Sequence, residues 1–173
     1  MFRMVAVAAI GVLAFGVAAC GSSPKVTPSF SSTAGCAVSV SLNTDNKPAI
    51  RVPSCAKKPT TLQTKDIVAG TGVAAKAGDA VNVKYIGFSW DNKKEFDASW
   101  DNGLGSFKVA PLGQAQVIDG WNQGLIGVKK GARRLLVLPP ALGYGAAGYP
   151  PSIAPNETLI FVVDVISVGP GTP

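Results

Sequence analysis

One short helical pattern stands among several strand patterns, and this imbalance limits the fold more than any other feature of the sequence. Ile118, Trp121 and Leu125 recur at i, i+3 and i+7, so one side of a two-turn helix is apolar. Gly120 and Gly124 make this helix weak in isolation, so it must be held by packing. The strand patterns are "DAVNVKYIGF", "RRLLVLPP" and "TLIFVVDVISV". The sequence therefore predicts an α+β domain in which an antiparallel sheet curls over one helix.

The N-terminus has the pattern of an export signal. An uncharged apolar run from Met4 to Ala19 is shorter than the ~18 residues that a membrane-spanning helix needs. The residues Val17–Cys20 resemble the bacterial lipobox, whose cysteine is acylated and becomes the new N-terminus. We therefore expect lipidation of Cys20 and a location on the extracytoplasmic face of the cell membrane. The alternative is an ordinary signal cleaved at a small-residue site.

The cysteine count agrees with this interpretation. The chain has three cysteines, and lipidation of Cys20 leaves Cys36 and Cys55 as a pair in an oxidising compartment. Between them, two alternating stretches flank the turn "NTDN", which predicts a short hairpin. We expect a Cys36–Cys55 disulfide to close it.

Composition and pattern divide the chain into five segments. The stretch from Gly21 to Gly35 is rich in Ser, Thr, Pro and Gly and has no apolar period, which is typical of a flexible tether. The predicted segments are a signal peptide (1–19), the lipidated cysteine with its tether (20–35), a hairpin extension (36–59), the principal domain (60–168) and a C-terminal tail (169–173).

A formal dinucleotide-binding motif, G-x-G-x-x-G, occupies 143–148. That motif needs a strand directly before it and a helix directly after it, whose amides bind phosphate. Pro139 and Pro140 end the strand early, and Pro150 and Pro151 follow where helical amides are needed. The sequence therefore disfavours a nucleotide site and leaves this aromatic, Gly-rich and Pro-rich loop to another role.

Charge and composition restrict the chemistry and the partners. Removal of residues 1–19 takes away Arg3, so 15 basic residues remain against 10 acidic ones, and the resulting charge of +5 suits a protein held at an anionic membrane. We interpret "VKKGARR" (Lys129, Lys130, Arg133 and Arg134) as a solvated turn entering a strand, with no nucleic-acid partner. The absence of histidine removes the usual Ser-His base and the commonest metal ligand. We expect no cofactor and no metal.

Residues 156–158, "NET", match the acceptor pattern for N-glycosylation. We interpret them as the start of the last strand rather than as a glycosylation site.

Three stretches together resemble the FKBP-type peptidyl-prolyl cis-trans isomerases, from about Thr60 to Val168. They are "VNVKYIGFSWDNKKEFDAS", "PLGQAQVIDGWNQGLIGVKKGARRLLVLPPALGYGAAGYP" and "PNETLIFVVDVISV", and their elements occur in the family's order. The resemblance implies an antiparallel sheet half-wrapped around one short helix, with an apolar cavity between them. A disulfide-stapled N-terminal extension would precede this domain.

The resemblance also implies which residues form the cavity, with Trp121 as its floor. The positions expected to act in catalysis are Tyr85, Phe96, Asp97, Trp121 and Tyr144, and those expected to bind substrate are Val117, Ile118, Tyr149, Ile153 and Phe161. By the same resemblance, Asp97 accepts a hydrogen bond from the Tyr85 hydroxyl.

The chain departs from the family at several positions. Asn102 replaces the usual arginine, Tyr149 stands where histidine is frequent, and Ser152 replaces an aliphatic residue. The loop before Phe107 is slightly longer than the common form, which leaves open whether this ring forms a wall of the cavity.

Two functions remain from the sequence. The first is an exported, lipid-anchored and monomeric prolyl isomerase whose clients are proline-containing secreted or surface polypeptides, and whose inhibitors are macrolides of the FKBP class. The second is a catalytically weak FKBP-like module that binds a partner. The retained set of cavity residues favours the first, whereas Asn102 keeps the second open.

Overall fold

The structure is a computed structural model that describes residues 35–103 and 105–171. Its strands and helices are β1 (Ser39–Val40), β2 (Ile50–Arg51), β3 (Gln63–Val68), β4 (Asp79–Ser89), β5 (Glu95–Ala98), β6 (Phe107–Val109), α1 (Asp119–Gly124), β7 (Arg133–Leu138), the 3-10 turn η1 (Pro140–Leu142) and β8 (Leu159–Pro170). The predicted signal peptide and Cys20 lie outside the described residues. Within the described ranges, no helix is long and apolar enough to cross a membrane.

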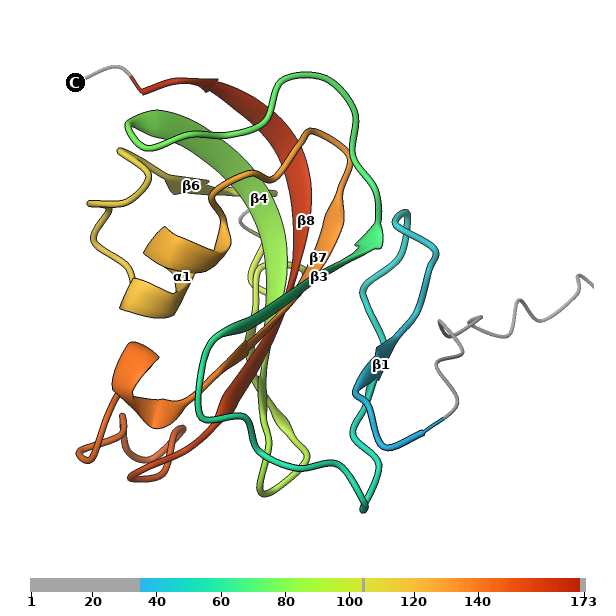
Figure 1. Ribbon diagram of the computed structural model, residues 1–173, viewed down its shortest axis with the longest axis vertical. Coiled ribbons are helices and arrows are strands. Elements are labelled where there is room, and N and C mark those ends of the chain that lie inside the picture. Colours follow the sequence, from blue (N-terminus) through green and yellow to red (C-terminus); the bar gives the residue numbers. More distant parts are fainter. Residues whose placement is uncertain (1–34, 104, 172–173) are drawn as a thin grey trace, which may run out of the picture.

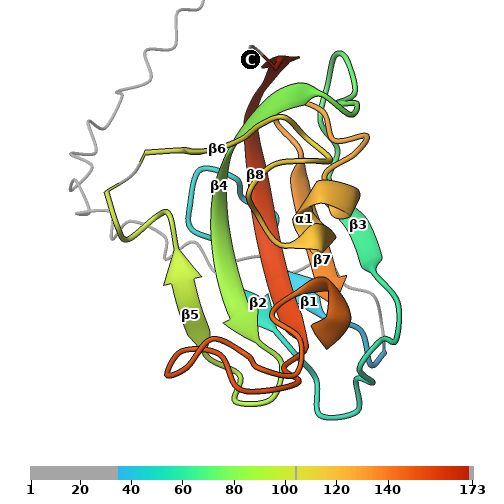
Figure 2. The same ribbon diagram turned by 90° about the vertical axis from the view of Figure 1, so that its left-hand side faces the viewer.

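A six-stranded antiparallel sheet forms the body of the protein (Figure 2). Its order is β3-β7-β8-β4-β5, and β6 also pairs with β4. The long strand β4 pairs with β6 through 81–83 and with β5 through 86–88, so one edge of β4 holds two short strands in succession. This sheet with one short helix confirms the α+β class predicted from the strand and helix patterns.

The helix α1 lies against one face of the sheet, as Figure 1 shows. Its two glycines permit this close approach. A Cβ atom on Gly120 would lie 2.5 Å from a methyl carbon of Leu138, and one on Gly124 would lie 2.8 Å from a methyl carbon of Leu136. The glycines that weaken the isolated helix therefore allow it to press onto β7. Leu125 and the floor residue Trp121 enter the same core, with 0% and 4% of their surface exposed.

The N-terminal hairpin covers the opposite face of the sheet (Figure 1). β1 and β2 pair antiparallel, and the Cys36–Cys55 disulfide closes the hairpin at its base with a Cα–Cα distance of 5.1 Å. Both sequence predictions for this segment are confirmed. The hairpin and the sheet share a second apolar cluster that includes Val40, Trp90 and Leu135.

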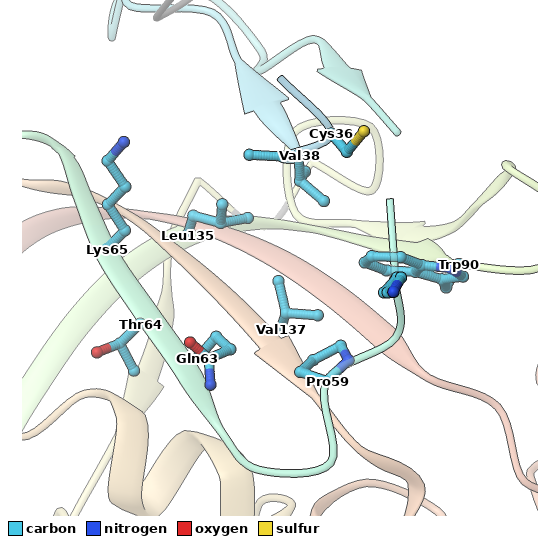
Figure 3. Close-up of a pocket in the computed structure, with 11 residues that line it drawn as sticks. Cys36, Val38, Pro59, Gln63, Thr64, Lys65, Trp90, Leu135 and Val137 are labelled. Atoms are coloured by element: carbon cyan, nitrogen blue, oxygen red, sulfur yellow. The ribbon is translucent and has the colours of Figure 1, made fainter. Parts of the chain in front are cut away.

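A groove remains where the base of the hairpin meets the sheet. It has a volume of about 360 Å³, and its lining includes Val38 of the hairpin, Leu135 and Val137 of β7, and Trp90 (Figure 3). Beside this groove, the apolar cluster that the hairpin shares with the sheet holds the hairpin in place.

The structure corrects the interpretation of the basic stretch 128–134, which leads into β7. Lys129 and Lys130 are exposed as expected of a solvated turn, but Arg133 is fully buried. Its guanidinium pairs with Asp164 of β8 at 2.5 and 2.7 Å. It also donates to three backbone carbonyls of the hairpin turn, those of Ser41, Asn43 and Asn46. A buried arginine is tolerated here because a carboxylate and several carbonyls replace its water.

The C-terminal segment also differs from the prediction. β8 continues to Pro170, which is opposite Asp79 of β4, so the first two residues of the predicted tail belong to the sheet. Proline is tolerated at this last position because it ends the strand and is not needed as a further donor.

Candidate active site

A cavity of about 180 Å³ lies between the sheet and α1, and its lining includes Trp121 of that helix. Seven separate parts of the chain line it: β4, β5, β6, the segment before α1, α1 itself, the loop after η1, and β8. The lining residues are Tyr85, Phe96, Asp97, Phe107, Gln116, Val117, Ile118, Trp121, Tyr144 and Phe161. Eight of them are among the ten residues that the resemblance implied, namely all except Phe107 and Gln116.

Trp121 is the centre of an aromatic cluster at the base of this cavity. Its ring makes edge-to-face contacts with Tyr85, Phe107 and Phe161 at centroid distances of 5.1, 5.9 and 5.3 Å. Such contacts stabilise aromatic groups beyond their buried area and fix the rings in place. The indole N–H of Trp121 is buried without a hydrogen-bond partner among the described residues. A bound acceptor would satisfy this donor.

A β-bulge directs two consecutive side chains of β5 into the cavity. Gly87 of β4 pairs with Asp97 while Phe88 pairs with Glu95, so Phe96 is the extra residue. Consecutive strand residues ordinarily point to opposite faces, but a bulge can re-aim one of them. Both Phe96 and Asp97 consequently line the cavity. The Phe96 ring lies over Gly87, where a Cβ atom would be 2.6 Å from two of its carbons.

The carboxylate of Asp97 is held by a phenol. The Tyr85 hydroxyl donates to Asp97 Oδ2 at 2.5 Å, which confirms the hydrogen bond that the resemblance implied. Burial, together with Asp97, raises the pKa of Tyr85 well above its ordinary value. The Tyr85 backbone is bonded in turn to Ser99, whose hydroxyl accepts from the Tyr85 amide at 2.8 Å. The phenol therefore remains protonated and in one orientation at neutral pH.

Tyr144 is brought to the cavity by the loop that follows η1. Burial raises its pKa, and the nearby charge of Asp97 adds to this effect, so it too keeps its hydroxyl proton. The loop carries the formal G-x-G-x-x-G stretch, and no helix begins at its end in the described chain. It folds tightly at Gly148, where a Cβ atom would meet the Ile153 carbonyl at 2.5 Å. A side chain is therefore excluded at this position for packing reasons.

Two residues of the predicted substrate-binding set do not line the cavity. Tyr149 is 64% exposed and is connected to the site through Tyr144, whose ring centroid lies 5.7 Å away. Ile153 is 3% exposed and belongs to the core. The two residues form an isolated antiparallel bridge, so the loop is closed tightly at this point.

The segment before α1 is fixed by a buried amide. Asn122 accepts hydrogen bonds from the amides of Gly113 and Ala115 and donates to the Ala115 carbonyl, at 3.0 to 3.1 Å. These bonds hold the chain that leads into Val117 and Ile118 against the helix. The cavity wall made by Val117 and Ile118 is therefore rigidly attached to its floor.

The sequence left undecided whether Phe107 lines the cavity, and it gave no prediction for Gln116. Phe107 was uncertain because of the longer loop before it, yet its ring contacts both Tyr85 and Trp121. Gln116 was missed because a polar residue in a loop gives no periodic signal. Its position directly before Val117 was the only available indication.

The site can bind and orient a ligand, and it offers few groups for covalent chemistry. Its walls are mainly aromatic and aliphatic, and its single carboxylate already accepts a phenol hydrogen bond. Across residues 35–103 and 105–171, no three His, Cys, Asp or Glu side chains gather as a metal site would require. The arrangement suits a ligand that is held by shape, desolvation and a few hydrogen bonds.

Comparison with known proteins agrees with this geometry. A family model described as FKBP-type peptidyl-prolyl cis-trans isomerase matches residues 72–166, a range that contains every lining residue. An "FK506-binding protein" from Streptomyces anulatus is 45% identical over 124 residues, which cover 70% of this chain and 97% of that protein. A "Probable FK506-binding protein" from Corynebacterium glutamicum is 40% identical over 123 residues, or 70% and 98% of the two chains.

A longer relative matches over the same kind of domain. The "46 kDa FK506-binding nuclear protein" of Spodoptera frugiperda is 47% identical over 104 residues, which are 60% of this chain and only 24% of the insect protein. The similarity is therefore centred on one domain that occurs both alone and within larger proteins. The match to the family model, the identity to these relatives and the aromatic cavity agree, and the chain belongs to the FKBP-type peptidyl-prolyl cis-trans isomerases.

Proposed function

We propose that this chain is an exported, lipid-anchored isomerase that accelerates X–Pro rotation in secreted or surface polypeptides without a covalent step. The observation that carries the catalytic part is the cavity, in which the Tyr85–Asp97 pair faces the Trp121 floor. The export part is supported by the signal pattern and the lipobox-like residues 17–20.

The uncatalysed reaction explains what such a cavity must supply. Rotation about an X–Pro bond loses amide conjugation and has a barrier of ~18–20 kcal/mol. The twisted amide is less polar across the C–N bond than the planar amide. A dry apolar pocket that fits the twisted form therefore stabilises the transition state more than the ground state. A million-fold acceleration needs ~8 kcal/mol of such differential binding.

Each group of the cavity has a definite part in this proposal. The proline ring of the substrate lies on Trp121, and Phe96 and Phe161 border it on one side. The Tyr144 hydroxyl remains protonated at neutral pH and donates to a substrate carbonyl. Asp97 holds the Tyr85 ring in place, and no proton is transferred to or from substrate. Val117 and Ile118 border the side chain that precedes proline.

The ligand class follows from the same cavity. Proline-containing polypeptides are the clients, and macrolides of the kind named in the relatives' descriptions compete with them for the site. Because the walls are apolar, peptides with Leu or Phe before proline are expected to react roughly tenfold or more faster than those with Glu or Gly, since burying one aliphatic side chain contributes ~1.5–3 kcal/mol.

The catalytic proposal is tested with the chain from residue 20 carrying Cys20→Ser. X–Pro peptides are followed by NMR exchange and by a protease-coupled assay, with and without FK506. Turnover that FK506 inhibits supports the proposal. A folded protein that binds the peptides without accelerating any of them would instead establish the binding module.

The location is tested separately in cells. Wild type and the Cys20→Ser variant are fractionated, and the membrane-bound share of each is measured. Loss of membrane association in the variant supports the lipid anchor. Equal retention of both forms on the membrane would exclude it.

A further inference from the structure

We propose that the N-terminal hairpin is part of the catalytic apparatus, because it positions the edge strand β5 through Lys47. The inference rests on the isomerase site proposed above. It assigns Lys47 as a positioning residue, which acts on Phe96 and Asp97 without touching substrate.

Lys47 joins the hairpin to both ends of the segment that carries Phe96 and Asp97. Its ammonium donates to Glu95 Oε1 at 2.8 Å and also to Asp101 Oδ2. Glu95 directly precedes the two cavity residues, and Asp101 follows them by four positions. One cation therefore binds the chain on either side of the bulge, at the first residue of β5 and in the turn after it.

β5 needs such support because of its place in the sheet. Among the described strands it pairs only with β4, at the edge, over four residues interrupted by the bulge at Phe96. Edge strands with a disrupted ladder have fewer backbone hydrogen bonds to fix them. Ala98 on the same strand lies in the apolar cluster that the hairpin covers. The hairpin thus supports β5 by packing as well as by charge.

Contacts other than those of Lys47 hold the hairpin turn that carries this residue. The buried guanidinium of Arg133 bonds to the carbonyls of Asn43 and Asn46, at 2.6 and 2.9 Å, directly before Lys47 in the chain. The Cys36–Cys55 disulfide holds the base. Because the backbone of the turn is already ordered, forming the ion pairs requires ordering of the side chains only.

The charges of this contact persist at neutral pH. Burial acts to lower the pKa of Lys47, but the hydrogen bonds to Asp101 and Glu95 outweigh it and raise that pKa above its ordinary value. The hydrogen bond from Lys47 lowers the pKa of Asp101.

The contact between Lys47 and Asp101 lies next to Asn102 in the sequence, and Asn102 stands where the FKBP family usually has arginine. Lys47 is outside the range 72–166 that matches the family model, so this cation is supplied by the extension.

The test compares Lys47→Met with a matched control, Lys58→Met. Lys58 belongs to the same extension and pairs with Asp91 at 2.6 Å, in the turn between β4 and β5 and away from the cavity residues. Lys47→Met removes the contacts to both Glu95 and Asp101, whereas Lys58→Met removes the single ion pair to Asp91. Turnover of a Leu-Pro peptide, its KM and thermal unfolding are measured for each, together with the rescue variant Lys47→Arg.

We expect Lys47→Met to lower kcat by about two- to fivefold with little change in KM, because an exposed pair shifts an equilibrium by only this order. Lys58→Met should match wild type in turnover, and Lys47→Arg should restore most of the loss. In ~1 M salt, where charges are screened within ~3 Å, wild type should approach the Lys47→Met rate while that variant stays unchanged.

Three results would overturn the inference. They are wild-type kcat in Lys47→Met, an equal loss in Lys58→Met, and no rescue by Lys47→Arg. An inactive wild type would instead refute the proposed isomerase function, so the two failures are distinguishable.

Discussion

Replacing Gly87 with alanine tests whether the bulged strand β5 forms the catalytic wall. The added Cβ would lie 2.6 Å from two carbons of the Phe96 ring and 3.0 Å from one carbon of Phe161. Neither ring can yield freely, because the two rings also contact each other edge-to-face at a centroid distance of 5.7 Å. The Phe96 ring must therefore move into the cavity or carry β5 away from β4.

The size of the effect follows from the crowding. Over-packing a well-filled core costs ~1–3 kcal/mol of folding free energy, which a domain of this size survives. Activity should fall further than stability, because a displaced ring occupies part of a cavity of only about 180 Å³. A loss of ~1.4–2.7 kcal/mol of transition-state stabilisation corresponds to a 10- to 100-fold lower kcat/KM.

The assay is protease-coupled turnover of a Leu-Pro peptide, with denaturant unfolding measured on the same samples. Gly169→Ala in β8 is the matched control, because a Cβ atom there meets nothing within 4 Å. The double variant Gly87→Ala/Phe96→Val should recover stability but not activity. Wild-type kcat/KM in folded Gly87→Ala would refute the reasoning.

Four further perturbations test the remaining parts of the site. Trp121→Ala should nearly abolish turnover and lower stability by ~3–5 kcal/mol, because it leaves a void under the cavity; turnover close to wild type would show that the indole is not the floor. Asp97→Val should lower kcat while FK506 affinity, measured by calorimetry, changes little. Between pH 6.5 and 9, kcat/KM should stay constant, because the raised pKa of each cavity phenol keeps its proton bound throughout; a decline toward pH 9 would contradict this. Replacing Cys36 and Cys55 with serine should cost ~3 kcal/mol of stability, concentrated in the hairpin, as hydrogen exchange would reveal.

Local sequence patterns predicted much of the fold. The apolar spacing of Ile118, Trp121 and Leu125 predicted the single helix, and its two glycines implied that packing must hold it. The alternation on either side of "NTDN", with two cysteines at its ends, predicted the closed hairpin. These features depend on neighbours a few residues apart, and the sequence records such neighbours directly.

Most of the cavity could be anticipated for a different reason. Tyr85, Asp97 and Trp121 occur in short motifs in the order of a known family, and their roles were carried over from that resemblance. Position within a motif did not guarantee position in the cavity, however. Tyr149 and Ile153 belong to the expected loop, yet one faces solvent and the other the core.

What the sequence by itself determined is the helix, the three long strands and the hairpin, together with most aromatic lining residues through the family resemblance. Only the tertiary structure decided the burial of Arg133, the bulge at Phe96 and the contact of Lys47 with β5. The hydrogen bond from Arg133 to Ser41 spans 92 positions, and that from Lys47 to Glu95 spans 48. No local periodicity encodes partners so far apart. They meet because the hairpin buries its apolar face against the back of the sheet, and this packing selects which charged groups are desolvated and paired.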